Sequence, residues 1–342
     1  MFTSRGYEEQ LMKASPRHYS IGVRLGAIAF AFAAIASASA QEDPAKYPTR
    51  AIHIIVGFTP GGGNDIIARI VGQKLSESLG QPVVIENKPG AGAVVATEYV
   101  AKSAPDGYTL LVGASGAMTI NPAVYAKLSY DSIRDFTPVS ELGSFPLILV
   151  VNMSSPIKSV ADLVAYAKAN PDKTNYSSAS AAFQLATELF KQKTGAPMQE
   201  IPYKGANDSV MAVISGQVTA TIADAGPVSG QIKGGQVRAL AVAAPNRMVD
   251  FPDVPTMKEA GADVDAVLWS GIFVPKATPP AIVKKLEGEF MRIMRLPDVI
   301  ARLKPLGIES VGNSSDEFAR IVAADIARWT AVARAGNIKM EQ

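Results

Sequence analysis

From residue 48 onwards the chain alternates between two hydrophobic patterns. Short runs rich in β-branched residues, such as 52–57 and 109–112, predict strands. Segments in which apolar residues recur every three or four positions, such as 66–79 and 314–332, predict helices. Strands and helices that alternate in this way are typical of an α/β protein in which helices flank a mainly parallel sheet.

Both patterns continue along the rest of the chain. In addition, four segments carry residues suited to capping the start of a helix. A side-chain oxygen there accepts a hydrogen bond from an N–H group that has no partner inside the helix. Further strands are expected at 81–86, 147–151, 175–176, 201–203, 219–223, 237–242 and 267–274. The expected caps are Thr256 with Glu259, Ser314 with Glu317, Asn207 or Asp208, and Thr278 ahead of two prolines.

The loops after the expected strands are built from small residues. Gly, Ala, Ser and Pro dominate 58–65, 87–93, 113–117, 177–182 and 224–227. Such a loop leaves N–H groups at the start of the next helix without partners, and the helix dipole adds partial positive charge there. Because loops after parallel strands gather at one edge of a sheet, we expect anion-binding loops in two lobes that face one another across a cleft.

The first forty residues have the pattern of an export signal. Basic residues lead into an apolar run at 25–35, and Ala38-Ser39-Ala40 offers small residues at a cleavage site. A membrane anchor is the alternative, but the run is shorter than the roughly 20 residues that span a bilayer. We therefore expect a signal peptide over 1–40, cleavage after Ala40 and a periplasmic mature protein.

The amino-acid composition argues against several classes of chemistry. The chain has no cysteine and two histidines, which argues against disulfides, thiolate catalysis and a histidine-based metal site. Residues 1–40 hold four of the 33 cations and two of the 31 anions, so the mature chain is formally neutral. A neutral chain offers no basic surface for nucleic acid. We expect no cofactor, no metal and no nucleic-acid partner.

Three of the glycine loops partly resemble motifs of known chemistry. The loop at 60–63 lacks the Lys and Ser/Thr of a phosphate loop, and neither 61–63 nor 90–92 is followed by the third glycine of a dinucleotide fingerprint. The segment 113–117 resembles the nucleophile elbow of a serine hydrolase, with Ser115 as the nucleophile, but its second glycine comes one residue early. An exported hydrolase that uses Ser115 is a remote alternative to a binding protein.

A set of short segments resembles one known family along nearly the whole mature chain. Together they are similar to the substrate-binding proteins of tripartite tricarboxylate transporters, the Bug family of extracytoplasmic solute receptors. The segments are Tyr47-Pro48, 58–69, 84–92, 105–110, 135–139, 201–205, 238–242 and 251–256.

The resemblance implies a type II periplasmic binding protein with two lobes, each a mainly parallel sheet flanked by helices. Lobe 1 is expected to comprise 41–145 plus 268–342, and lobe 2 to comprise 146–267. The implied function is capture of a small organic carboxylate in the cleft and its delivery to membrane permease subunits, without catalysis. A ligand-sensing periplasmic adaptor for a membrane sensor kinase is the alternative.

The resemblance also points to particular residues. It assigns ligand contacts to Phe58, Gly61, Gly62 and Asp65 in lobe 1, and to the 177–182 loop and Asp224 in lobe 2. With the neighbouring loop positions added, the expected ligand-binding residues are Phe58, Pro60, Gly61, Gly62, Gly63, Asp65, Ser115, Gly116, Ser178, Ser180, Phe183 and Asp224.

One loop departs from the family pattern. Where the family has a glycine-containing serine loop followed by His-Leu-Ala, this chain has Ala181-Ala182-Phe183-Gln184-Leu185-Ala186, so that Gln184 replaces the histidine. From this difference we expect a reshaped pocket, in which Phe183 contacts a ligand that is apolar or aromatic at its far end.

Overall fold

A computed structural model describes residues 44–203 and 205–340. The expected signal peptide over 1–40 and its cleavage site lie outside these residues. From Lys46 onwards the chain forms one compact unit. Among the helices that the structure describes, none combines the length and the apolar character needed to cross a membrane.

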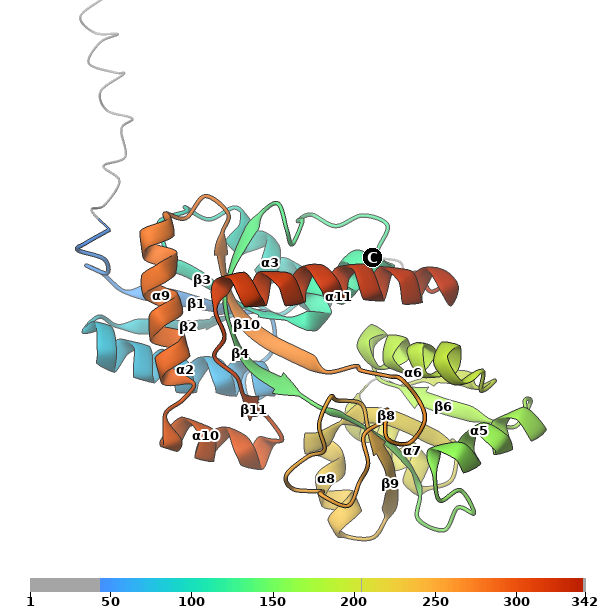
Figure 1. The fold of residues 1–342 in the computed structure, drawn as a ribbon. Helices are drawn as coiled ribbons and strands as arrows, with labels where there is room; N and C mark the ends of the chain where they lie inside the picture. The colour runs from blue at the N-terminus through green and yellow to red at the C-terminus, as the bar shows by residue number, and fades with distance from the viewer. Residues whose placement is uncertain (1–43, 204, 341–342) are drawn as a thin grey trace, which may run out of the picture. The chain divides into compact units, whose positions relative to one another are not determined.

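The first sheet has six strands in the order β11-β4-β10-β3-β1-β2. β1 pairs in parallel with β2 and β3, whereas β10 is antiparallel to both β3 and β4 (Figure 1). Gly271 in β10 has no room for a side chain, because a Cβ atom there would lie 2.3 Å from Phe318. The strands are β1 (Ile52–Val56), β2 (Val83–Asn87), β3 (Thr109–Ala114), β4 (Phe136–Phe145), β10 (Leu268–Pro275) and β11 (Glu309–Ser310).

The second sheet has five strands in the order β7-β6-β8-β5-β9. β6 pairs in parallel with β7 and β8, and β5 is antiparallel to β8 and β9. The strands are β5 (Leu147–Asn152), β6 (Asn175–Ser178), β7 (Gln199–Pro202), β8 (Ala220–Asp224) and β9 (Val237–Val242).

The expected α/β fold with two sheets and flanking helices is confirmed, but both sheets are mixed rather than mainly parallel. The reason lies where the chain passes between them. Only Pro146 separates β4 from β5, so the chain continues directly from one sheet into the other. β6, β7 and β8 are instead joined by helical crossovers, which bring the chain back in the same direction.

The helices flank both sheets. The first residues of these helices show which of the expected caps form. Ser314 Oγ accepts a hydrogen bond from Glu317 N at 3.2 Å, as expected. The long helix expected from residue 66 begins at Gly63. The helices of four residues or more are α2 (Gly63–Leu79), α3 (Val94–Ala101), η2 (Gly116–Ile120), α4 (Asn121–Val124), α5 (Val160–Ala169), α6 (Ala181–Thr194), α7 (Ala206–Ile214), α8 (Ala225–Lys233), α9 (Pro280–Ile293), α10 (Pro297–Leu303) and α11 (Ser315–Ala335).

Two other expected caps are corrected. The N-cap of α7 is Gly205, so Asn207 and Asp208 lie inside the first turn, where the small residue before them makes the turn into the helix. Thr278 Oγ1 donates to Pro275 O at 2.7 Å, and Pro279 occupies the N-cap of α9.

The capping box at Thr256 forms as expected, although in a turn rather than a helix. Thr256 N donates to Glu259 Oε2 at 2.8 Å, and Glu259 N donates to Thr256 Oγ1 at 3.1 Å.

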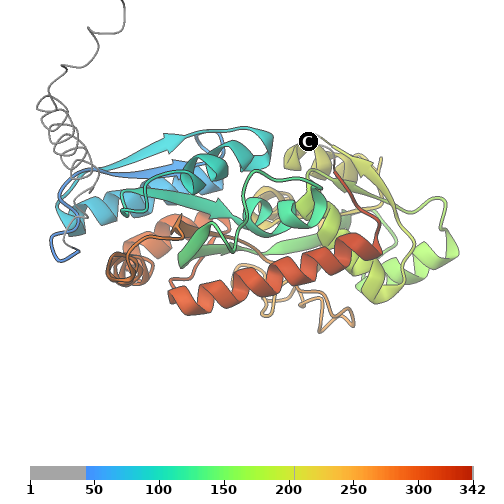
Figure 2. The same ribbon diagram turned by 90° about the horizontal axis from the view of Figure 1, so that it is seen from above.

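The C-terminal helix α11 packs against elements of both sheets (Figures 1 and 2). Near its start, Phe318 is buried against Trp269 of β10, with ring centroids 5.0 Å apart. Near its end, Trp329 is buried in the core cluster that also contains Phe190 of α6. Gln192 of α6 donates from Nε2 to Val332 O at 3.1 Å, so α11 connects the six-stranded sheet to a helix of the five-stranded sheet.

Candidate functional site

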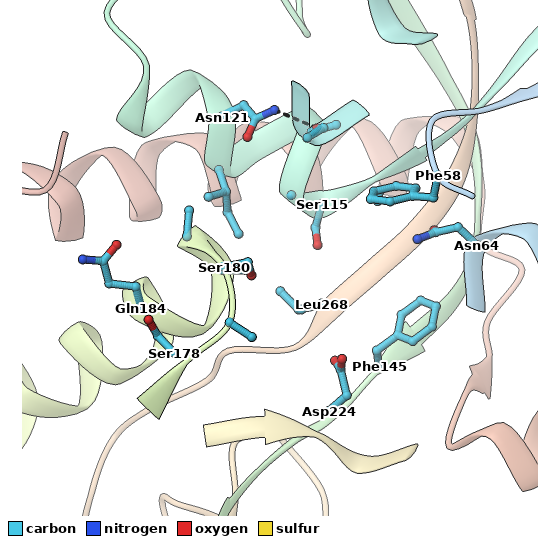
Figure 3. Close-up of a pocket in the computed structure, with 18 of the residues that line it drawn as sticks. Phe58, Asn64, Ser115, Asn121, Phe145, Ser178, Ser180, Gln184, Asp224 and Leu268 are labelled. Carbon is cyan, nitrogen blue, oxygen red and sulfur yellow. Dashed lines mark hydrogen bonds between the residues drawn. The ribbon is translucent and has the colours of Figure 1, made fainter. Parts of the chain in front are cut away.

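A cavity of about 550 Å³ is lined by residues from both sheets. Figure 3 shows Phe58, Asn64 and Phe145 on one side of it. The end of β6, the loop after it and the start of α6 lie on the other side, where Ser178, Ser180 and Gln184 are labelled. The cavity walls therefore include the small-residue loops that follow β1, β3, β6 and β8. The other lining residues are Gly63, Gly92, Ala114, Ser115, Gly116, Ala117, Ile120, Asn121, Tyr125, Ala179, Ala181, Ala182, Glu200, Pro202, Tyr203, Asp224, Leu268, Trp269, Ser270 and Met340.

On the six-stranded side, the start of α2 borders the cavity. Gly62 is extended at the N-cap, and its carbonyl accepts from Asp65 N and Ile66 N at 3.0 and 2.9 Å. Gly63 and Asn64 come before these first donors in the chain, so their N–H groups have no acceptor within the helix. The Asn64 side chain is fixed by a hydrogen bond from the Ser270 hydroxyl. The start of α2 thus presents backbone donors to the cavity.

On the five-stranded side, the start of α6 has the same arrangement. Ser180 is extended at the N-cap and makes no side-chain cap. The first hydrogen bond of the helix runs from Gln184 N to Ser180 O at 3.1 Å, so the N–H groups of Ala181 and Ala182 have no helical acceptor. The N-termini of α2, beside the six-stranded sheet, and α6, beside the five-stranded sheet, therefore line one cavity. Each N-terminus favours a negatively charged group.

Asp65 does not line the cavity but holds the loop that does. Its carboxylate accepts from Gly61 N at 2.9 Å, from Asn87 Nδ2 at 2.8 Å, and twice from Arg69, each at 2.9 Å. The hydrogen bonds from Arg69 lower the pKa of Asp65 to about 2, together with those from Gly61 and Asn87 and against the effect of burial. In the structure Asp65 supports the 58–63 loop, and a direct ligand contact at Asp65 stays a prediction.

Asp65→Asn is expected to lower the free energy of unfolding at neutral pH by about 2 kcal/mol, because the folded state loses the charge that Arg69 and two N–H donors stabilise. The lowered pKa means that this stabilisation is present above pH 3.8 and is lost as the pH falls through about 2. Urea unfolding of both proteins at pH 7 and near pH 2 measures it. A difference that persisted undiminished near pH 2 would contradict the electrostatic origin.

Asp224 lies at the N-cap of α8 but makes no side-chain cap. It lines the cavity, and Figure 3 shows its carboxylate directed into it. Burial raises the pKa of Asp224 to about 6. The carboxylate is therefore ionised at pH 7.5 and is available to a group inside the cavity.

Sequence reasoning missed Glu200, which also lines the cavity. Its Oε2 accepts from Gln184 Nε2 at 2.5 Å, and its Oε1 accepts from the Ser178 hydroxyl. The position of Glu200 next to the expected strand at 201–203 could have placed it near a strand end, but its partners come from a different loop. Asn64, Asn121, Phe145 and Leu268 were missed as well and line the cavity.

The structure places some of the sequence-predicted residues together around the cavity and others away from it. Phe183 belongs to the buried core cluster around α6 and is 8% exposed. The physical reason is the turn of the helix, which directs position 183 away from the side where Ala181 and Ala182 line the cavity. Seven predicted residues line the cavity, namely Phe58, Gly63, Ser115, Gly116, Ser178, Ser180 and Asp224, whereas Pro60, Gly61, Gly62, Asp65 and Phe183 do not.

Ser115 has surroundings unlike those of a nucleophile. Its backbone is in the ordinary helical region, at φ −52° and ψ −35°, without the strain of a nucleophile elbow. Its hydroxyl oxygen accepts from Trp269 N at 3.2 Å. The one histidine within the described residues, His53, pairs through Nδ1 with Glu86 at 2.5 Å. Ser115 therefore lines the cavity, but among the described residues no histidine lies at hydrogen-bond distance from it to act as a base.

Two sheets flanked by helices, with one cavity bordered by the N-termini of α2 and α6, are typical of solute-binding receptors of the periplasmic binding type. The chain belongs to the tripartite tricarboxylate transporter receptor family, whose model matches residues 67–338. The resemblance found in the sequence is thereby confirmed.

Relatives along most of the chain agree with this assignment. Protein BugT of Bordetella pertussis is 36% identical over 93% of this chain and 99% of its own length. A Rhodopseudomonas palustris protein, Rpa4515, solved with adipate, is 35% identical with a TM-score of 0.74, covering 86% of this chain and 99% of that one. MatC from the same species, solved with malate, is 32% identical with a TM-score of 0.70, covering 84% and 99%.

Proposed function

We propose that this protein captures a small organic carboxylate in the cavity and delivers it to the permease subunits of a tripartite transporter, without catalysing a reaction. The observation that carries the proposal is the pair of helix N-termini, α2 and α6, that line one cavity from two sheets. Adipate and malate in the two solved relatives are ligands of the same class. Backbone N–H groups and helix dipoles can hold a carboxylate without a cationic side chain.

The proposal includes two lobes that close on the ligand. Lobe 1 would comprise 41–145 plus 268–342 and lobe 2 would comprise 146–267, since the strands of the two sheets divide at Pro146 and before β10. Closure would be driven by a ligand that contacts both lobes. Export would use residues 1–40 as a signal peptide cleaved after Ala40, which N-terminal sequencing of periplasmic protein tests.

A thermal-shift panel of mono-, di- and tricarboxylates tests the binding function. The protein should first be unfolded and refolded to remove any retained metabolite. We expect at least one carboxylate to raise the melting temperature, because a ligand that binds only the folded state stabilises it. No shift with any carboxylate would overturn the proposal. Native mass spectrometry of freshly purified protein would then identify the natural ligand.

Ala181→Pro tests whether the α6 N-terminus binds the carboxylate. Proline removes the N–H of Ala181 at the first helical position, where it is well tolerated, and Ser180 before it is already extended. We expect the affinity for the best carboxylate of the panel to fall about tenfold, the effect of losing one hydrogen bond to a charged group. Ala181→Gly keeps the N–H and is the matched control. Equal affinities in the two variants, measured by calorimetry, would contradict the assignment.

A further inference from the structure

The cavity wall formed by the five-stranded sheet carries hydrogen-bond acceptors and negative charge. Glu200 in β7 and Asp224 at the end of β8 both line the cavity. A carboxylate in its ionised form can only accept hydrogen bonds. Among the described lining residues there is no Lys, Arg or His to balance these two carboxylates.

The hydrogen bonds to Glu200 decide which donors and acceptors its neighbours Ser178 and Gln184 can offer to the cavity. The Ser178 hydroxyl donates its single hydrogen to Glu200, so the Ser178 oxygen offers only lone pairs to the cavity. Gln184 donates one amide N–H to Glu200 at 2.5 Å, which sets the orientation of its amide group. Glu200 thus remains an acceptor on its free lone pairs, held in place by two donors.

Asp224 has a different role from an ordinary N-cap. Within the described residues no side chain or backbone N–H donates to its carboxylate, although Asp224 is the N-cap residue of α8. Asp224 is half-buried, and Figure 3 shows it near two apolar residues, Phe145 and Leu268. A partly buried carboxylate without a donor is unfavourable unless a ligand supplies one.

These features are complementary to an ammonium group. A second carboxylate on this wall would lie near two like charges, which is unfavourable in a cavity of reduced dielectric. A ligand hydroxyl would supply a donor but would leave the charge of the wall unbalanced. An ammonium supplies three donors and a positive charge together, and charge-assisted hydrogen bonds are the stronger kind.

We propose that the preferred ligand of this receptor is an amino carboxylate, whose carboxylate binds at the helix N-termini and whose ammonium binds to Asp224 and to the Glu200–Ser178 pair. The inference rests on the function proposed above and narrows its ligand class. It assigns to Glu200 a role in specificity that the sequence patterns did not indicate.

Calorimetry with matched ligand pairs tests the inference. Each pair has the same number of carbons and differs in whether one end is a carboxylate or an amine: succinate with γ-aminobutyrate, and adipate with ε-aminocaproate. Malate with aspartate adds the case in which a hydroxyl is replaced by an ammonium. We expect the amino member of at least one pair to bind at least tenfold more tightly. If no amino member bound at least tenfold more tightly than its partner, the inference would be overturned and the proposed function would stand, whereas no binding by any of these acids would overturn both.

Two neutral variants then locate the ammonium. Glu200→Gln and Asp224→Asn each remove one charge while keeping the shape of the side chain. We expect each to lower the affinity for the amino carboxylate and to raise that for its dicarboxylate partner, so that their ratio falls at least tenfold. Glu77→Gln, an exposed carboxylate on α2 outside the cavity, is the matched control and should leave the ratio unchanged.

Circular dichroism spectra and melting temperatures without ligand establish that the variants are folded. In folded protein, a ratio that stayed unchanged in both Glu200→Gln and Asp224→Asn would overturn the assignment of the ammonium to this wall.

Discussion

Replacing Glu141 with Gln is expected to raise the free energy of unfolding at pH 8 by about 3 kcal/mol. Glu141 lies in β4 and is 6% exposed, and Asn313 Nδ2 donates to its Oε2 at 3.2 Å. Burial raises the pKa of Glu141 to about 7, with smaller contributions from the negative charges of Asp325 and Glu317. Above that pH the folded state must hold a buried charge, and Gln removes it while keeping an acceptor for Asn313.

The sign of the effect gives it a distinctive pH profile. The folded pKa is raised above the ordinary 4.5, so the wild-type protein retains its full stability below 4.5 and loses part of it as the pH rises through about 7. Urea unfolding at pH 4 should show little difference between wild type and variant, and the difference should grow to its full size by pH 8. Glu309→Gln, at an exposed position in the neighbouring strand β11, is the control and should change stability by less than about 0.5 kcal/mol. A Glu141→Gln variant less stable than wild type at pH 8 would refute the prediction.

Phe183→Ala is expected to cost about 3 kcal/mol of stability without a specific loss of binding. The side chain is buried in the core cluster around α6 and does not line the cavity, so its removal leaves a void in the core. Phe183→Leu keeps most of the volume and should cost about 1 kcal/mol. Urea unfolding measures both losses.

Binding of benzoate separates the two roles considered for Phe183. If Phe183 is a core residue, any affinity for benzoate is the same in wild type and in folded Phe183→Ala. If the variant kept its full stability and lost benzoate binding alone, Phe183 would have to contact the ligand, as its place in the sequence first indicated.

The sequence predicted the elements better than their pairing. The strands and α11 follow from hydrophobic periodicity, and the Ser314 cap follows from local hydrogen bonding between residues three apart. The antiparallel placement of β5 and β10 depends instead on how the chain passes between two sheets, which no local pattern encodes. Gly205 at the start of α7 shows the same limit on a smaller scale, because two better capping residues follow it.

The sequence predicted the parts of the cavity wall that backbone loops form, but not the parts formed by side chains that the fold brings together. Small residues after strands indicated the loops at Gly63, Ser115, Ser178 and Asp224. The sequence placed Glu200 no more closely than beside an expected strand, since its partners Ser178 and Gln184 are 22 and 16 positions away and only the fold brings them together. Phe183 follows a loop that lines the cavity, yet its side chain packs in the core cluster around α6, because a residue next to such a loop can still face the core.

The contact between α6 and α11 links the sheets at a third point, besides the two places where the chain passes from one to the other, at Pro146 and between β9 and β10. Val332 accepts a hydrogen bond from Gln192, and the nearby Trp329 is fully buried. Any rotation of one sheet relative to the other must shift this contact or bend α11 between Phe318 and Trp329. If the lobes close on a solute as proposed, its residence time would depend on this helix contact outside the cavity, and substitutions there would change the rate of release without altering the residues that line the cavity.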